Sequence, residues 1–176
     1  MLDTVDAQLV DIKSRKVAVF VDIMFSRVSR SNLLGLTKMV AQVVLCSPPT
    51  LMPPDVVNGF PKAHPFASVS ITHNLSEAVK NADVIMALRL QAERQSRGRL
   101  PSLREYSRLY GINSETVKLA KEDVLIMHPG PMNEGIEIDT EIAHGPHSAI
   151  QDQVTNGVAV RMALLYAVAS ANRGDK

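Results

Sequence analysis

Arginine side chains follow two of the apolar segments of this sequence. Arg27 and Arg30 come soon after the apolar run of residues 16–22, and because they are three residues apart, a helix starting there would place both on one face. Arg89 directly follows a second apolar run, with Gln91 two positions further on. A guanidinium group can hold a carboxylate through two parallel hydrogen bonds, and a charge-assisted bond of this kind contributes about 1.5–3 kcal/mol. Two such arginines would suit a small dicarboxylate, although a single arginine is more often solvated or bonded to loop carbonyls.

A rigid segment, His128-Pro129-Gly130-Pro131, follows another apolar run. The two prolines fix the backbone, and Gly130 lets a ligand approach the main chain closely. The same residues are equally typical of a strand-to-loop turn that binds nothing. Because His128 stands before a proline, we interpret it as capping or packing this turn and not as a general base.

Other familiar chemistries have no matching pattern. The sequence contains no glycine-rich phosphate loop, G-x-S-x-G motif or dinucleotide-binding fingerprint. The scattered acidic residues and the remaining histidines lack the spacing of metal ligands, so we predict no metal site. The residues considered for this role are Asp22, Asp139, Glu141, His64, His73, His144 and His147.

Short apolar runs alternate with helical patterns along most of the chain. Apolar runs of about five residues are typical of buried strands, and the segments between them carry capping residues or apolar residues at helical spacing. This alternation predicts an α/β fold, a three-layer doubly wound parallel sheet of about five strands that binds ligands beyond the carboxyl ends of its strands. The expected strands are residues 16–22, 42–46, 67–71, 83–88 and 123–127. Helices are expected soon after residue 30, at 76–82, before residue 110, at 114–120 and at 153–171.

Composition limits the class of protein. A chain of 176 residues with 45% hydrophobic content is long enough for one compact domain, and 19 basic against 18 acidic residues create no field that would attract nucleic acid or an anionic membrane. Cys46 is the only cysteine, so we interpret it as a small buried hydrophobe in a cytoplasmic protein. The most apolar stretch, residues 158–171, is shorter than the ~20 residues that span a membrane, and we predict a buried helix.

Four short motifs occur in order across nearly the whole chain. They are Asp22-Ile-x-x-Ser26-Arg27-Val28-x-Arg30-Ser31-Asn32, Leu88-Arg89-x-Gln91-x-Glu93-Arg94, His128-Pro-Gly-Pro-Met-Asn133 and Asn156-Gly-Val-Ala-x-Arg161. Together they resemble the aspartate carbamoyltransferase family. Ornithine carbamoyltransferases share the fold but carry His-Cys-Leu-Pro in place of the third motif, which favours aspartate as the amino-acid substrate.

The resemblance implies a two-domain enzyme that transfers the carbamoyl group of carbamoyl phosphate to L-aspartate in de novo pyrimidine biosynthesis. Carbamoyl phosphate would bind the first domain and aspartate the second, and direct attack by the amine would need no cofactor. Arg27 and Arg89 match the positions that hold the aspartate carboxylates, and Gln91 matches a residue that supports that pocket. Glu93 and Arg94 match positions that link a mobile loop to the other domain.

The same resemblance places the backbone of Pro129, Gly130 and Pro131 where the family meets carbamoyl phosphate and the attacking amine. The family's Ser-Thr-Arg-Thr and His-Pro-Thr-Gln segments, which serve carbamoyl phosphate, have no counterpart in this sequence. We therefore expect the chain to be inactive without a carbamoyl-phosphate domain, which in the family also makes most of the contacts of a trimer.

The domain organisation expected from the resemblance has three parts. Residues 1–14 would be the remnant of an inter-domain helix, and residues 15–152 the aspartate-binding α/β domain. Residues 153–176 would form a C-terminal helix that packs back towards the missing domain.

Three residues depart from the family's usual pattern. Val21 replaces a glycine and Phe25 a histidine, both at the rim of the aspartate pocket, while Glu134 replaces an arginine near two anionic substrates. The charge reversal should weaken substrate binding. These departures leave a second hypothesis open, a non-catalytic assembly subunit of a pyrimidine-pathway complex, and a third, a truncated or relic gene product.

Overall fold

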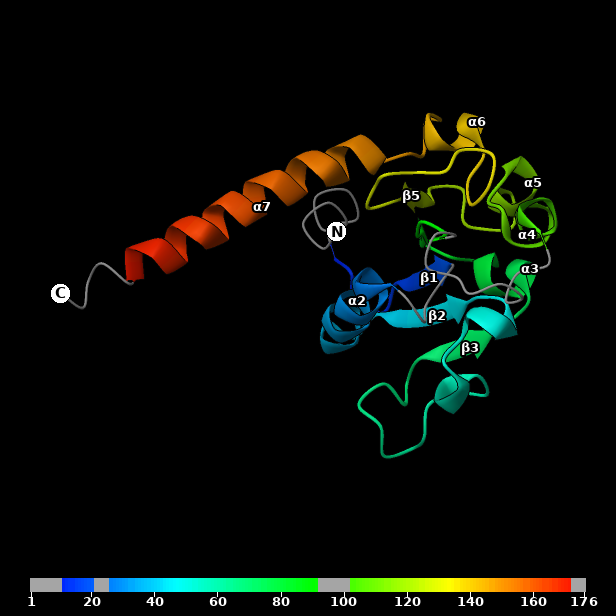
Figure 1. Ribbon diagram of the computed structural model, residues 1–176, viewed down its shortest axis with the longest axis horizontal. Helices are drawn as coiled ribbons and strands as arrows, with labels where there is room; N and C mark the ends of the chain where they lie inside the picture. Colours follow the sequence, from blue (N-terminus) through cyan, green and yellow to red (C-terminus); the bar gives the residue numbers. More distant parts are fainter. Residues whose placement is uncertain (1–10, 21–25, 92–101, 172–176) are drawn as a thin grey trace.

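The computed structural model describes residues 11–20, 26–91 and 102–171 (Figure 1). Its strands are β1 Lys16–Phe20, β2 Gln42–Cys46, β3 Ser70–Thr72, β4 Val84–Ala87 and β5 Leu125–Met127. Its α-helices are α2 Arg27–Lys38, α3 Leu75–Val79, α4 Leu103–Tyr110, α5 Ser114–Val117, α6 Thr140–Ala143 and α7 Ile150–Ala171. Two single-turn 3₁₀ helices, η1 Pro49–Leu51 and η2 Pro54–Val56, lie in the proline-rich segment after β2.

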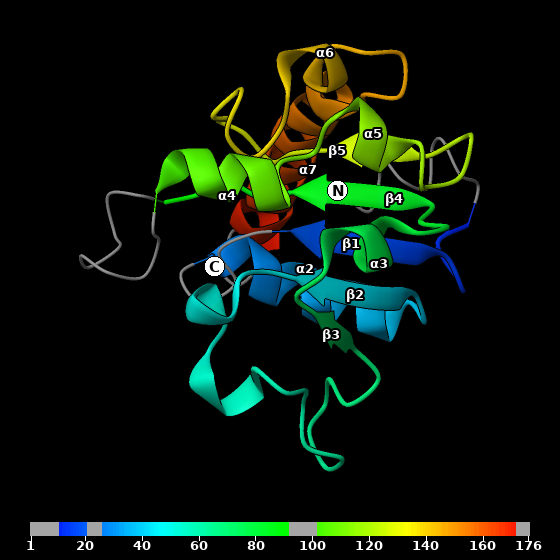
Figure 2. The same cartoon turned by 90° about the vertical axis from the view of Figure 1, so that its right-hand side faces the viewer.

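All five strands are parallel and lie in the order β3-β2-β1-β4-β5 (Figure 1). Helix α2 and the start of α7 lie on one side of the sheet, and α3, α4 and α5 lie on the other (Figure 2). Because the central strands are covered on both faces, all four residues of β4 are buried. The predicted three-layer α/β fold is confirmed.

The strand order reverses at the centre of the sheet. From β1 the chain moves outwards to β2 and β3, then returns to the other side of β1 to form β4 and β5. β1 therefore pairs directly with β4, from Val17↔Val84 to Phe20↔Ala87. In open α/β sheets, ligands bind in the crevice outside the carboxyl ends of the two strands that flank such a reversal.

Local hydrogen bonds explain where several elements begin and end. The side chain of Ser26 accepts a hydrogen bond from the Ser29 backbone at 3.2 Å and caps α2. The third strand begins at Ser70, later than predicted, because the preceding residues form turns. The backbone N–H groups of Ala67 and Val69 donate to the carbonyls three residues earlier and so are not available to a strand. Helix α3 ends at Val79, earlier than predicted, because the backbone of the next residue is not helical.

A buried carboxylate holds the amino ends of the central strands together. Asp83 is 3% exposed, and its Oδ2 accepts a hydrogen bond from the Lys16 backbone at 2.9 Å. Its Oδ1 lies 2.9 Å from Arg15 Nη1 and 2.6 Å from Lys121 Nζ. Burial by itself raises the pKa of this carboxyl, but the hydrogen bonds from Lys121, Lys16 and Arg15 outweigh burial and leave the pKa below its ordinary value.

We expect Asp83→Asn to lower the free energy of unfolding by about 2–3 kcal/mol at neutral pH, because two cations lose their carboxylate. The folded pKa of Asp83 lies below the unfolded value, so its stabilisation is complete above about pH 4 and is lost as the pH falls further. Urea unfolding of both proteins at neutral pH and near pH 3 measures this. An equal difference in stability at the two pH values would contradict the role given to the carboxylate.

The prediction that residues 158–171 form a buried helix is wrong for this chain. Helix α7 contacts the body of the protein only near its start and then extends away from the sheet (Figure 1). Leu165 is 72% exposed and Tyr166 is 76% exposed. The apolar pattern predicted a helix but could not show what covers it. No other described element packs against the C-terminal turns of α7. No helix in the described part of the chain is long and apolar enough to cross a membrane.

Candidate functional site

Two of the predicted site arginines follow the strands that flank the reversal. Arg27 is the first residue of α2, on the segment that follows β1, and it is exposed. Arg89 follows β4 by two residues and is half-buried. Leu88 donates its backbone N–H to the Phe20 carbonyl at 3.1 Å, so the pairing of β1 and β4 continues up to the residue before Arg89. Both arginines therefore belong to the carboxyl edge of the sheet.

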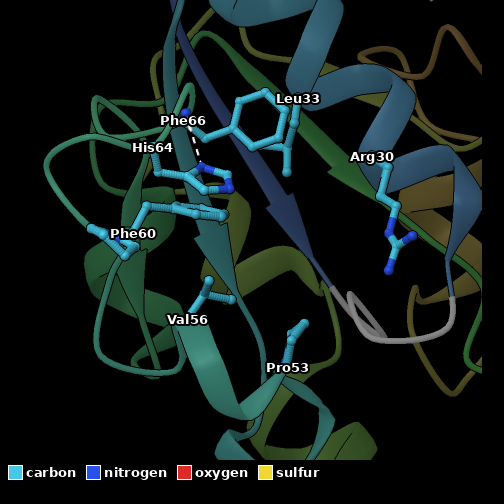
Figure 3. Close-up of a pocket in the computed structure, with 8 residues that line it drawn as sticks. Arg30, Leu33, Pro53, Val56, Phe60, His64 and Phe66 are labelled. Carbon is cyan, nitrogen blue, oxygen red and sulfur yellow. Dashed lines mark hydrogen bonds between the residues drawn. The ribbon is translucent and has the colours of Figure 1, made fainter.

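Arg30 does not share that location. It lies one turn along α2 from Arg27 and lines an apolar cavity formed with residues 53–66, on the β2 side of the sheet (Figure 3). Helix α2 begins at Arg27, so the two arginines lie one turn apart on it, as expected, and Arg30 in addition lines this cavity.

Gln91 brings a buried hydrogen-bond acceptor to the same edge. Its Oε1 atom is inaccessible to solvent and has no hydrogen-bond partner among the described residues. A buried amide oxygen without a partner is costly to folding. Leu90, between Arg89 and Gln91, accepts a hydrogen bond from Asn133 Nδ2 at 3.2 Å.

The His128-Pro-Gly-Pro131 segment leaves β5 as a fixed turn. His128 is fully buried, and its ring atom Nδ1 accepts a hydrogen bond from the backbone N–H of Gly130 at 2.9 Å. The backbone N–H of His128 donates a hydrogen bond to Gln153 Oε1 at 3.0 Å. The interpretation of His128 as a residue that packs and caps the turn is confirmed. Gly130 has a φ of +66°, which other residues adopt only with strain. Pro131 is exposed, so this part of the turn faces solvent.

A buried acid, which the sequence analysis did not single out, completes this arrangement. Because Nδ1 of His128 accepts a hydrogen bond, the proton of the neutral ring resides on Nε2, which lies 3.4 Å from Glu137 Oε1. That oxygen also accepts the backbone N–H of Asn133 at 2.6 Å. Glu137 is fully buried and stands between Ile136 and Ile138 in the sequence. An acidic residue between two isoleucines was the only sequence feature that could have identified it as a buried functional residue.

Hydrogen bonds of Glu137 and Asn133 join the segment after β5 to the segment after β4. Glu137 holds the backbone of Asn133, and the side chain of Asn133 reaches the carbonyl of Leu90. The turn that follows β5 is thereby fixed against the segment of Arg89 and Gln91, which follows β4. These contacts give the carboxyl edge of the sheet a defined backbone shape.

Residues 13–168 match the family described as "Aspartate/ornithine carbamoyltransferase, Asp/Orn binding domain". The chain belongs to this carbamoyltransferase family. It is 58% identical over 150 residues to the aspartate carbamoyltransferase catalytic subunit of Syntrophobacter fumaroxidans, in a match that covers 85% of this chain and 47% of that protein. It is 54% identical over 165 residues to that of Roseiflexus sp., covering 94% and 51% respectively. The chain spans about half the length of the curated carbamoyltransferases it matches.

Solved carbamoyltransferase structures have the same fold. The aspartate transcarbamoylase of Trypanosoma cruzi in complex with N-(phosphonacetyl)-L-aspartic acid superposes with a TM-score of 0.73 at 29% identity, covering 93% of this chain and 52% of that one. The ornithine carbamoyltransferase of Pyrococcus furiosus superposes with a TM-score of 0.76 at 27% identity, covering 92% and 52%.

The residues in which this carbamoyltransferase chain departs from its family's usual pattern are only partly described. Glu134 is exposed, and its Oε1 lies 3.2 Å from Nε2 of His144, the residue that follows α6. Hydrogen bonds from Thr140 and then His144 hold the pKa of this carboxyl below its ordinary value. Val21 and Phe25 lie outside the described residues, as do Asp22 and the predicted loop residues Glu93 and Arg94.

The lone cysteine plays no part in this carbamoyltransferase site. Cys46 is fully buried at the end of β2, as predicted. Burial, with a smaller contribution from Glu77, raises the pKa of its thiol to about 12. Among the described residues, no group of three or more His, Cys, Asp or Glu side chains is arranged to hold a metal ion.

We expect two substitutions of His128 to separate the effect of its hydrogen bond to Gly130 from the effect of its contact with Glu137. The Oδ1 atom in His128→Asn can take the place of Nδ1 and keep the hydrogen bond to Gly130, whereas His128→Gln places its polar atoms near the Nε2 position and loses that bond. Amide hydrogen exchange at Gly130 should therefore be about fivefold to tenfold faster in His128→Gln than in His128→Asn.

Urea unfolding provides the control for this comparison, because both variants alter the contact with Glu137. If the two variants have equal exchange at Gly130, the Nδ1 hydrogen bond does not fix the turn.

Proposed function

We propose that this chain is the aspartate-binding half of an aspartate carbamoyltransferase. The amine of L-aspartate attacks the carbamoyl carbon of carbamoyl phosphate, the bond from that carbon to the phosphate oxygen breaks, and the amine loses a proton. The products are N-carbamoyl-L-aspartate and phosphate, and the reaction belongs to cytoplasmic de novo pyrimidine biosynthesis. The observation that carries the proposal is the position of Arg27 and Arg89 on the segments that follow β1 and β4, beside the reversal of strand order.

The chemistry of the site favours aspartate over ornithine. Two guanidinium groups suit the two carboxylates of aspartate. Ornithine would leave one guanidinium without a carboxylate and would bring its own side-chain ammonium beside it. Gln91, two residues after Arg89, would support this pocket. The relatives more than 50% identical to this chain are named as aspartate carbamoyltransferase subunits.

The Pro129, Gly130 and Pro131 backbone would meet the carbamoyl group and the attacking amine. The contacts of His128, Glu137 and Asn133 support this role because they fix the backbone before a substrate arrives. Catalysis in such a site rests on holding amine and carbamoyl carbon together, which is worth up to about 7–11 kcal/mol, and on fixed dipoles near the developing oxyanion. This route requires no cofactor.

The chain would work with a carbamoyl-phosphate domain. The length of its relatives supports this requirement, as does the exposed apolar surface of α7. One stripe of that helix is formed by Val154, Val158, Met162, Leu165 and Val168. A helix that is apolar to this extent is normally covered, so the stripe would dock on the carbamoyl-phosphate domain. Glu93 and Arg94 would link a loop to the same domain, and the parent assembly would be a trimer.

We expect the chain alone to bind succinate, a dicarboxylate that lacks the reactive amine. Arg89→Ala and Arg27→Ala should each weaken this binding at least tenfold, because each removes a charge-assisted contact worth about 1.5–3 kcal/mol. Isothermal calorimetry measures the dissociation constants. Arg104→Ala, which removes an exposed arginine from α4, is the matched control and should leave them unchanged.

Undiminished binding by Arg89→Ala would remove the assignment of the aspartate site. If the unmodified chain binds no succinate but associates tightly with a carbamoyl-phosphate domain, the chain is a non-catalytic assembly subunit. The interaction of Glu134 with His144, where the family usually has an arginine, is the observation that favours that second candidate.

We expect carbamoyl aspartate to form when the chain is mixed with a separately produced carbamoyl-phosphate domain. Leu165→Lys should raise the concentration of chain needed for half-maximal activity at least tenfold, because docking a leucine contributes about 1.5–3 kcal/mol and burying a lysine opposes it. Ser170→Lys places the same charge on the opposite side of α7 and is the matched control.

Product formation in a colorimetric assay, titrated with each variant, gives these concentrations. Thermal unfolding should be the same for both variants, since neither side chain packs on the body of the chain. If Leu165→Lys and Ser170→Lys behave alike, the apolar stripe is not the docking surface.

A further inference from the structure

A cavity lies on the β2 side of the sheet, apart from the proposed aspartate site. Helix α2 forms one wall through Arg30 and Leu33, and the segment of residues 53–66 forms the rest (Figure 3). Its volume is about 460 Å³, which lies within the ~300–1,000 Å³ typical of pockets for small molecules. Pro53 and Pro61 are part of its lining, and their fixed φ angles limit how far this segment can collapse into the space.

Aromatic rings build one side of the cavity. The rings of Phe60 and His64 stack with their centroids 4.8 Å apart, and Phe66 meets Phe60 edge-on at 5.6 Å. Both phenylalanines also pack against the hydrophobic core, so the rings are held from behind. Together with Leu33 and Val56, they present an apolar surface on which a flat ligand can stack.

Two side chains in the lining, Arg30 and His64, carry nitrogen donors. Nδ1 of His64 accepts the backbone N–H of Phe66 at 3.2 Å, so the proton of the neutral ring resides on Nε2. In Figure 3 this second ring nitrogen points away from Phe66, towards the side of the cavity where Arg30 lies. Among the side chains that the structure describes, none that lines the cavity is acidic, and no carboxylate lies within ion-pair distance of Arg30.

We propose that this cavity is a second binding site, which takes a small organic monoanion with a flat apolar body. The Arg30 guanidinium and Nε2–H of His64 hold the anionic group, and the body stacks on Phe60 and Phe66. A second charge on the ligand would have to be buried against the apolar wall, so dicarboxylates such as aspartate are disfavoured here. The site is independent of the proposed function because it uses neither Arg27 nor Arg89.

Benzoate is a suitable probe, with benzamide as its uncharged counterpart. We expect benzoate, titrated into the ¹⁵N-labelled full chain, to shift the amide signals of Arg30, His64 and Phe66 in a saturable manner. Arg30→Gln should weaken this binding at least tenfold, and His64→Asn, which keeps the acceptor for Phe66 but loses Nε2–H, should weaken it several-fold. Benzamide should bind at least tenfold more weakly than benzoate.

Arg27→Gln is the matched control, because it removes an arginine one turn away on the same helix and should leave benzoate binding within twofold. Signals remote from the substituted residue should be unchanged in each variant, which shows that the fold is intact. Saturable shifts that persist unchanged in Arg30→Gln would overturn the proposal. It is equally overturned by equal binding of benzamide, or by the absence of any shift at these three residues.

Discussion

The direct parallel pairing of β1 with β4 is the constraint on which the rest of the arrangement depends. These strands are far apart in sequence, and their pairing forces the segments that follow them to the same edge of the sheet. At the opposite edge, Asp83 bonds to the backbone of Lys16 and to two cationic side chains, so the amino ends of both strands are held together. This pairing places the segments of Arg27 and Arg89 at the same edge of the sheet.

A buried polar network extends this constraint to the next strand. His128 and Glu137 are fully buried, and each orients a backbone group of the turn that follows β5. Buried polar groups are costly unless they are paired, so these contacts favour one shape of the turn over its alternatives. Asn133 then ties that shape to Leu90, beside the arginine that follows β4. The ends of β1, β4 and β5 are thus linked to one another by hydrogen bonds.

The chain combines a buried apolar core with one helix whose apolar side chains are exposed. The sheet and the helices on its two faces bury a continuous apolar cluster. Helix α7 instead exposes apolar side chains along most of its length, which is unusual for a helix of this composition. The curated carbamoyltransferases that the chain matches are about twice as long as this chain.

The sequence by itself determined the elements and the class of fold, because apolar periodicity and capping are local properties. The strand at residues 42–46 was predicted with its correct bounds, and the motifs around Arg27, Arg89 and His128 indicated the family before any coordinates. Whether those two arginines bind aspartate stays a prediction. The tertiary structure alone decided that Arg30 lines a separate cavity, that Glu137 supports the turn after β5, and that α7 is exposed. Each of these depends on contacts between distant segments, and a single sequence does not record which surfaces meet.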